Sequence, residues 1–295
     1  MQPPLCQGPD PRPRKPKFSI PAGATDCHCH LFEEPGKYPL AANRSYTPPL
    51  CPLSDYLKLM ETLGLARTVQ VNASAYGHDN SVTLDAIAAL GQSRARGVAG
   101  LHPDATGREI KRLHAGGMRG VRLSTSVKGY GGPELLEIMG RKIQPFGWHV
   151  QLHVDDGREL AGLEQPLLRH PTPLVFDHLG RVRGADGVGS PGFQVLLRVL
   201  KRRDDCWVKI SSWYRLSNSG PPDYADMKPL AAALVAARPD RVVWGSNWPH
   251  PIWSGHMPND GDLLDLFCEW VPDEDLRMQI LVTNPARLYG FDTKP

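Results

Sequence analysis

Short apolar and β-branched runs alternate with longer amphipathic stretches along most of this chain. Each short run has the length of a buried strand, and turn-forming or polar residues separate it from the next element. Eight such runs can be counted. We predict strands at residues 24–31, 68–74, 98–102, 120–124, 149–154, 174–179, 207–212 and 241–247.

The longer stretches repeat apolar residues at helical spacing and fill most of the gaps between the predicted strands. Eight strands alternating with helices predict an α/β fold, and they fit a (β/α)8 TIM barrel better than a doubly wound sheet. Because no internal repeat and no linker stand out, we expect one barrel domain. The predicted helices are residues 53–63, 82–95, 159–168, 193–201, 225–237, 263–270 and 274–288.

The first 22 residues differ from the rest in composition. They contain seven prolines and carry four of the 34 basic and one of the 31 acidic residues, which leaves 30 of each sign elsewhere. We therefore predict a flexible, basic, proline-rich arm at residues 1–22 ahead of a barrel domain at 23–295. A neutral barrel domain argues against nucleic acid as a partner, because nucleic-acid binding concentrates Lys and Arg on a folded face.

Membrane insertion and secretion are not expected either. The longest apolar run, residues 230–237, is far shorter than the roughly 20 residues of a membrane-spanning helix, and no apolar signal-peptide segment follows Met1. The six cysteines include no CxxC pair, which indicates buried free thiols rather than a disulfide framework. These features predict a cytoplasmic protein.

Histidine is frequent where the predicted strands end. In a TIM barrel the active site forms at the carboxyl ends of the strands, so these polar residues are the candidates for chemistry. Side chains alternate along a strand, which places His28 and His30 on one face and Cys27 and Cys29 toward the surrounding helices. The histidines near predicted strand ends are His28, His30, His102, His153, His178 and His250.

A single histidine is usually structural, but a cluster indicates either a zinc site or general acid–base chemistry. Basic residues near other strand ends, namely Arg122, Lys128 and Arg215, favour a small anionic carboxylate as substrate, since arginine binds a carboxylate through two parallel hydrogen bonds. Aromatic residues near the same loops could shape the pocket or serve only as packing, and they are left out of the predicted site. They are Tyr130, Trp213, Tyr214 and Trp253.

Four motifs resemble those of a known family. Asp-Cys-His-Cys-His-Leu-Phe at 26–32, Asp-His-Leu-Gly-Arg at 177–181, Gly-Ser-Asn-Trp-Pro-His-Pro at 245–251 and Asn-Pro-Ala-Arg-Leu-Tyr at 284–289 occur in this order. They are similar to the amidohydrolase-related superfamily (amidohydrolase family 2), and within it to the lactonases that open 2-pyrone-4,6-dicarboxylate. The similarity extends from about residue 18 to residue 291.

This resemblance implies a barrel hydrolase that opens a cyclic ester without a divalent metal. Its histidines, here His28, His30 and His178, would polarise the lactone carbonyl, while a carboxylate on the eighth strand would activate water at the position of Asn247. Donors preorganised around a developing oxyanion supply a large part of such catalysis. The resemblance assigns the substrate carboxylates to positions Tyr46, Ser74, Arg122, Lys128, His153, Arg215 and His250.

Two residues depart from the lactonase pattern. Asn247 replaces the carboxylate, and an amide cannot take up a proton as a base. His153 stands where a tyrosine is expected, and together with His28 and His30 it could form a three-histidine zinc site that holds a water.

Several explanations of Asn247 remain open. His178 or His28 could serve as the base, a zinc-bound hydroxide could replace the carboxylate, or the asparagine could be a change introduced to trap a substrate. Two other functions also remain: a decarboxylase of the same superfamily and a barrel that binds a ligand without turning it over. The oligomeric state is left open.

Overall fold

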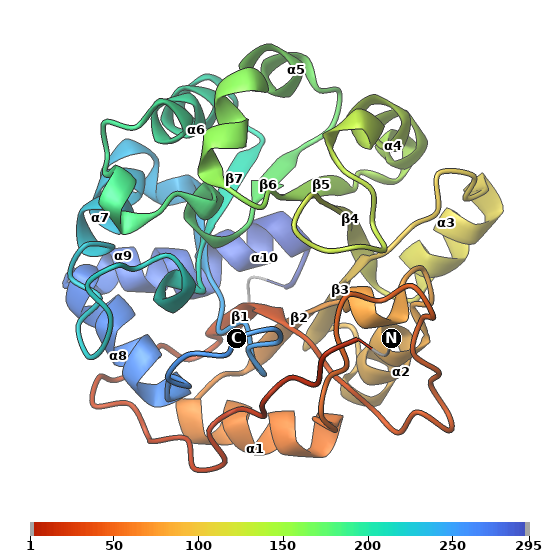
Figure 1. Cartoon of the computed structure of the whole chain (residues 1–295), viewed down its shortest axis with the longest axis horizontal. Coiled ribbons are helices and arrows are strands. Elements are labelled where there is room, and N and C mark those ends of the chain that lie inside the picture. The colour runs from red at the N-terminus through yellow and green to blue at the C-terminus, as the bar shows by residue number, and fades with distance from the viewer. Residues whose placement is uncertain (1–2, 293–295) are drawn as a thin grey trace.

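A barrel of eight parallel strands, surrounded by helices, forms the centre of the computed structural model, which describes residues 3–292 (Figure 1). Neighbouring strands follow one another in chain order, so the predicted TIM barrel is confirmed. Hydrogen bonds from Asn247 N to His28 O (2.7 Å) and from His30 N to Trp248 O (2.8 Å) join the last strand region to the first. The strands are β1 (Thr25–Cys29), β2 (Arg67–Val71), β3 (Ala95–Ala99), β4 (Met118–Ser124), β5 (His149–His153), β6 (Leu174–Phe176), β7 (Cys206–Ile210) and β8 (Val242–Trp244).

Ten α-helices are assigned among the described residues, and they lie mainly around the strands (Figure 1). The helix predicted at 53–63 is observed with the same bounds, whereas the helices α3 and α4 were not predicted. None of the helices described is long and apolar enough to cross a membrane. The helices are α1 (Leu53–Leu63), α2 (Ser81–Leu90), α3 (Gly107–Ala115), α4 (Leu136–Ile143), α5 (Glu164–Arg169), α6 (Pro191–Arg202), α7 (Lys228–Ala237), α8 (Asp260–Trp270), α9 (Glu274–Met278) and α10 (Asn284–Tyr289).

The third strand lies earlier in the chain than predicted. Helix α2 ends at Leu90, where Gly91 takes a φ of 79° that few other residues adopt, and β3 already begins at Ala95. The prediction of a helix to residue 95 and of a strand to His102 was therefore wrong. His102 follows the strand in a loop, and 58% of its side chain is exposed.

A bulge in β1 changes which side chains face the barrel interior. The pairing of β1 with β2 shifts register between Asp26 and Cys29. As a result Cys27 packs with Val69 and Tyr289 in the cluster at the base of the barrel, while Cys29 belongs to the larger core under the helices. The expectation that both cysteines face the helices was correct for Cys29 and wrong for Cys27.

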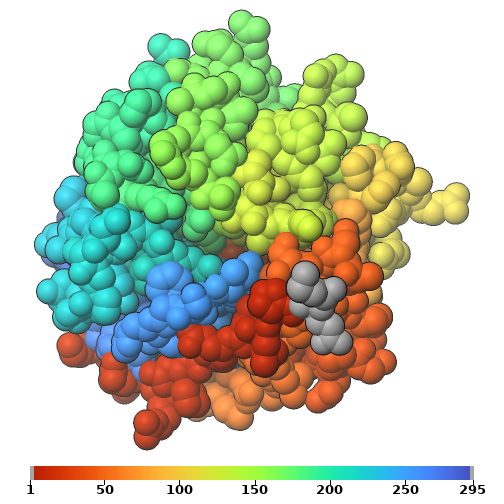
Figure 2. Space-filling view, viewed as in Figure 1, coloured from red at the N-terminus to blue at the C-terminus, as the bar shows by residue number. Residues whose placement is uncertain are grey.

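The described part of the N-terminal arm lies against the barrel domain. Lys17 N donates to Asp265 Oδ1 on α8 (2.8 Å), and Cys6 N donates to Thr47 O (2.9 Å). Figure 2 shows the arm, in red, crossing the molecular surface between the segment around residue 250, in blue, and the segment around residue 45, in orange. The arm thus connects two loops that are distant in sequence.

Candidate active site

A cavity of about 280 Å³ opens at the carboxyl ends of the barrel strands. The structure brings together here most of the residues that the sequence singled out, because the end of β4 and the loops after β1, β2, β4, β5, β6, β7 and β8 converge on this end. The cavity is lined by His30, Tyr46, Ser74, Arg122, Ser126, Val127, His153, Asp155, His178, Arg181, Arg215, Asn247, Pro251 and Ile252.

Three predicted site residues do not line this cavity. His28 is fully buried behind His30, whose ring nitrogen Nε2 lies 3.3 Å from His28 Nε2. Lys128 is exposed on the loop after β4, where its backbone N–H donates to Ser45 Oγ. His250 is buried, and its two ring nitrogens face Tyr214 and Asp260. The structure therefore does not bring the Lys128 and His250 side chains to the expected substrate position.

Below the cavity lies a buried ionic cluster built around Asp177. Arg122 Nε and Gln151 Nε2 each donate to Asp177 Oδ2 at 3.0 Å. Lys209 Nζ lies 3.5 Å from Asp177 Oδ1 and donates to Gln151 Oε1 at 2.6 Å. Burial raises the pKa of the Asp177 carboxyl, but Arg122, His28 and Lys209 outweigh it and hold this pKa well below the usual value. The floor of the cavity therefore carries one carboxylate between two basic side chains.

The proton on His30 can be placed from its partner. His30 Nδ1 lies 2.8 Å from the Val71 carbonyl oxygen, which only accepts hydrogen bonds, so His30 carries its proton on Nδ1. Its other nitrogen, Nε2, lies 3.3 Å from His28 Nε2. His28 Nδ1 lies 3.2 Å from Asp177 Oδ1, an acceptor, and 3.3 Å from Lys209 Nζ, a donor. The histidine pair is thus anchored to Val71 at one end and to the Asp177 cluster at the other.

His153 is oriented differently by Ser124 at the end of β4. The Ser124 hydroxyl oxygen accepts the backbone N–H groups of Ser126 (3.1 Å) and Val127 (3.3 Å), so its own proton is donated to His153 Nδ1 at 3.0 Å. His153 therefore carries its proton on Nε2. Because His153 lines the cavity, this N–H is a hydrogen-bond donor for a ligand.

All the clustered histidines are held neutral. Burial lowers the pKa of His28 to about 3, against the opposing effect of Asp177. Burial also lowers the pKa of His30, His153 and His178 well below the usual value, and nearby charge on Arg122 adds to this. Neutral imidazoles of this kind are good N–H donors and weak bases.

Positive charge in the cavity wall comes from Arg122, Arg181 and Arg215. Arg181 was quoted only as the last residue of a motif and was missed as a site residue, although its place three residues after His178 could have indicated it. Its guanidinium is held by the Asp155 carbonyl oxygen, which accepts from Arg181 Nη2 at 3.0 Å. Burial and the charge of Arg215 lower the pKa of Arg181 to about 10, so it remains a cation at neutral pH.

Asn247 is fixed by residues that the sequence did not assign to the site. Its Nδ2 donates to Tyr214 Oη at 2.9 Å and to Ser212 Oγ at 3.3 Å. Tyr214 in turn lies 2.8 Å from His250 Nδ1, and His250 Nε2 lies 3.3 Å from Asp260 Oδ1. No periodic pattern signals these contacts, because they join the loops after β7 and β8 to the start of α8.

The groups close enough to share a metal differ from the predicted set. Among the residues that the structure describes, ligand atoms within 4.8 Å of one another are found for His28, Asp177 and His178. The predicted set of His28, His30 and His153 is not among the groups found in the part of the chain that the structure describes.

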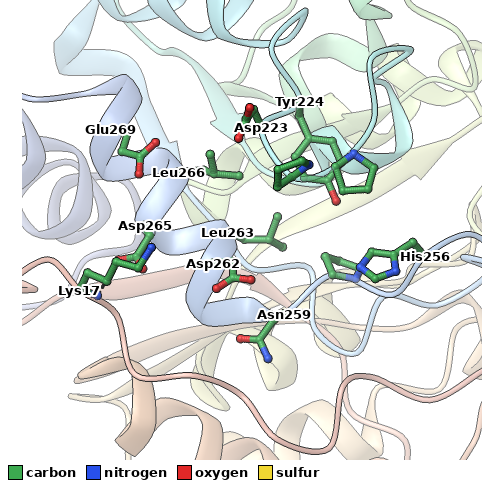
Figure 3. A pocket seen from close by; sticks show the side chains of 13 residues that line it. Lys17, Asp223, Tyr224, His256, Asn259, Asp262, Leu263, Asp265, Leu266 and Glu269 are labelled. Atoms are coloured by element: carbon green, nitrogen blue, oxygen red, sulfur yellow. Dashed lines mark hydrogen bonds between the residues drawn. The ribbon is translucent and has the colours of Figure 1, made fainter.

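A second cavity has the opposite charge and lies apart from the histidines. Figure 3 shows it between α8, the loop at Asp223 and Tyr224, and Lys17 of the arm. Carboxylates of Asp223, Asp262, Asp265 and Glu269 line it. An anionic ligand is therefore directed to the first cavity, where the arginines are.

A (β/α)8 barrel with neutral histidines and arginines at the carboxyl ends of its strands has the architecture of a barrel enzyme acting on a small anion. The chain belongs to the amidohydrolase family, whose sequence profile matches residues 25–291. The relationship predicted from the four motifs is thereby confirmed.

Two relatives and one solved structure are similar to this chain over nearly its full length. The 4-sulfomuconolactone hydrolase of Rhizobium radiobacter is 42% identical, over 97% of this chain and 96% of that protein. The 2-pyrone-4,6-dicarboxylate hydrolase of Comamonas testosteroni is 39% identical, over 94% of this chain and 93% of that protein. A solved structure from Agrobacterium tumefaciens has a TM-score of 0.84 at 30% identity and covers 94% of this chain and 99% of its own.

Proposed function

We propose that this chain hydrolyses a lactone that carries two or more anionic groups, in the manner of the 4-sulfomuconolactone and 2-pyrone-4,6-dicarboxylate hydrolases to which it is similar. The observation that carries the proposal is the convergence of three arginines and three neutral histidines on one cavity of about 280 Å³. Arginine pairs with carboxylate or sulfonate oxygens through parallel hydrogen bonds, and this geometry fixes the orientation of the ring.

The histidines are suited to the lactone carbonyl. As water adds to the carbonyl carbon, negative charge develops on the carbonyl oxygen, and the His153 Nε2–H can donate to it. His178 Nδ1 faces Ser211 Oγ at 2.7 Å, so its Nε2 is the nitrogen left for the ligand. Burial keeps these rings neutral, and a neutral imidazole carries one N–H that can donate to the carbonyl oxygen as negative charge develops there.

The attacking water requires an acceptor for one of its hydrogens. Asn247 lines the cavity, and its Nδ2 is already directed at Tyr214 and Ser212. The remaining polar atom, Asn247 Oδ1, can accept from the water and orient its lone pair toward the carbonyl carbon. Attack then breaks the ring C–O bond. One proton of the water passes to the leaving ring oxygen, which becomes a hydroxyl group, and the other is lost to solvent as the new carboxylic acid ionises to a carboxylate on the same open chain.

We propose that this reaction proceeds without a divalent metal. A metal bound by His28, Asp177 and His178 would lie beside Lys209 and Arg122, which already neutralise Asp177. Asp177 Oδ1 lacks a well-aligned hydrogen bond, yet its neighbours are His28 Nδ1 at 3.2 Å and the Lys209 amine. A dication would therefore be placed among like charges, and the donor set does not fit it.

The test follows the ultraviolet absorbance of 2-pyrone-4,6-dicarboxylate and of 4-sulfomuconolactone with this chain, with and without a chelator. We expect hydrolysis of at least one lactone at a rate that the chelator leaves unchanged. Asn247→Asp should raise the rate on the dicarboxylate by at least about 10-fold, because a carboxylate can also take up the proton. Asn247→Ala, the matched control, should lower it.

Three other results would each replace a part of this proposal. Loss of activity with the chelator would replace the metal-free proposal by a metal-dependent one. Binding of both lactones with no turnover, in wild type and in Asn247→Asp alike, would indicate a ligand-binding barrel. Release of carbon dioxide instead of ring opening would indicate a decarboxylase.

A further inference from the structure

Four buried side chains form a line from the cavity wall into the protein. Asn247 donates to the Tyr214 hydroxyl oxygen (2.9 Å), this oxygen lies 2.8 Å from His250 Nδ1, and His250 Nε2 lies 3.3 Å from Asp260 Oδ1. Each of the four residues is at most 3% exposed. Asn247 lines the cavity, whereas the other three do not.

The environment of the Tyr214 oxygen is unusual for a phenol. Asn247 Nδ2 and, at 3.4 Å, Arg215 Nε both donate to it. Each of these groups can only donate, so His250 Nδ1 is the partner among them that can exchange a proton with the phenol. An oxygen surrounded in this way serves as an acceptor.

Asp260 faces His250 as an ion-pair partner at 3.3 Å, without the alignment of a hydrogen bond. Its carboxylate is 1% exposed and lies in the first turn of α8, where the helix N-terminus favours negative charge. Its ion-pair partner among the described residues is His250. Carboxylate, imidazole and hydroxyl thus follow the order found in catalytic triads, with the imidazole between an orienting acid and a hydroxyl.

We propose that Tyr214, supported by His250 and Asp260, is a positioning residue that holds the Asn247 amide with Oδ1 toward the attacking water. This inference rests on the proposed lactone hydrolysis and assigns His250 and Tyr214 to Asn247 rather than to the substrate. The two ends of an amide differ: Oδ1 accepts the hydrogen of the water, whereas Nδ2 would donate to its lone pair and block the attack. Orientation therefore decides whether Asn247 helps.

The charges of the groups around Tyr214 favour the hydrogen bond from Asn247 Nδ2 to the Tyr214 oxygen. Burial opposes ionisation of Tyr214, but the charge of His250 and Arg215 lowers the Tyr214 pKa to about 8. Burial likewise opposes protonation of His250, but Tyr214 and Asp260 raise its pKa to about 9. The titratable and charged groups that act on the pair are Arg215, Asp260 and Tyr224. Above its pKa Tyr214 is a phenolate, and a phenolate oxygen is a stronger acceptor for the Asn247 N–H than a phenol oxygen is.

The kinetic test compares Tyr214→Phe with Tyr289→Phe. Tyr289 is also fully buried, but it lies at the base of the barrel, and its hydroxyl makes no hydrogen bond within the described part of the chain. We expect Tyr214→Phe to lower kcat about 10- to 100-fold with KM within about twofold, since Tyr214 does not line the cavity. Tyr289→Phe should retain wild-type kinetics. A change in KM alone would overturn the assignment.

A double-mutant cycle separates positioning from general support of the fold. The two oxygens of a carboxylate are equivalent, so the Asn247→Asp enzyme needs no orientation by Tyr214. In that background we expect Tyr214→Phe to change kcat by less than about threefold. An equal loss of kcat in both backgrounds would show that Tyr214 acts independently of Asn247, and the proposal would fail.

A measurement that requires no catalytic turnover tests this inference separately from the proposed function. The side-chain amide signals of Asn247 in nitrogen-15 NMR spectra are identified by their loss in Asn247→Asp. We expect them to titrate near pH 8 in wild type and to lose this titration in Tyr214→Phe. If they titrate while no lactone is hydrolysed, the positioning contact stands and the proposed reaction fails. If they do not respond to Tyr214, the positioning contact is refuted whatever the activity.

Discussion

Lys209 Nζ lies 3.5 Å from Asp177 Oδ1 at the floor of the cavity, and neither side chain is exposed. A fully buried lysine is costly unless an opposite charge accompanies it. Here one carboxylate is shared by Lys209 and Arg122, whose Nη2 lies 3.0 Å from Asp177 Oδ2. The histidines of the site are built on this cluster, so its integrity determines both stability and geometry.

Replacing Lys209 by methionine should destabilise the protein. The substitution removes one of the two cations beside Asp177 and leaves Gln151 Oε1 without its donor. We expect a loss of about 3 kcal/mol in the free energy of unfolding, the lower end of the cost of breaking a buried ion pair, because Arg122 remains. Urea denaturation measures this loss. Lys201→Met, at an exposed lysine, is the control, and its free energy of unfolding should stay within about 0.5 kcal/mol of wild type. Equal stability of both variants would contradict the importance of the pair.

Acid should unfold the protein through its buried histidines, and His149 isolates the effect from the catalytic groups. His149 lies in β5 and is 2% exposed; burial and the charge of Lys209 lower its pKa to about 3. The unfolded chain, with a histidine pKa near 6.5, binds this proton more readily. Stability is therefore fully present above about pH 6.5 and falls as the pH drops from there toward 3, by about 1.4 kcal/mol per pH unit for each such histidine.

The measurement is urea denaturation of wild type and His149→Gln between pH 8 and pH 5. We expect His149→Gln to flatten the slope below pH 6 by about 1.4 kcal/mol per unit. Between pH 7 and pH 8 the difference between the two proteins should stay constant. If the free energies of unfolding of the two proteins changed in parallel over the whole pH range, protonation of His149 would not be coupled to folding.

The barrel could be predicted because strand and helix periodicities are local properties of the sequence, but details that depend on packing could not. Lys209 in Val-Lys-Ile, like Arg122 in Val-Arg-Leu, is a cation within an apolar strand, but only Arg122 was predicted as a site residue. The inward position of Cys27 depends on a bulge in β1, and strict alternation cannot reveal it.

The histidines next to strand ends could be predicted as a cluster. The contacts among the loop residues Ser212, Asn247 and His250 could not be predicted, although Asn247 and His250 were themselves predicted as site residues. His30 follows β1 directly and His153 is the last residue of β5, so topology alone brings them together. Ser212, Asn247 and His250 instead adopt positive φ values of 56°, 62° and 59°. These unusual conformations aim the loops after β7 and β8 at each other, and they arise from tertiary contacts rather than from residue preference.

Arg181 should contribute mainly to substrate binding. Its side chain is 16% exposed and lines the cavity, so its loss removes one charged contact to an anionic lactone. We expect Arg181→Met to raise KM about 10- to 100-fold in steady-state kinetics, with kcat changed less. Arg183→Met, an exposed arginine nearby, serves as control. An effect on kcat alone would assign Arg181 to the reacting carbonyl instead of the distal anion.

The arm should shape the cavity entrance through two loops that line it. Thr47 N, next to Tyr46, donates to Pro4 O (2.7 Å), and Ile252 N donates to Cys6 Sγ (3.2 Å). Removing residues 1–7 frees both Tyr46 and Ile252, whose positions complete the cavity wall. Since ordering these loops then has to accompany binding, we expect KM to rise about 3- to 10-fold while the urea midpoint changes little. Unchanged KM in the truncated enzyme would show that both loops keep their places without the arm.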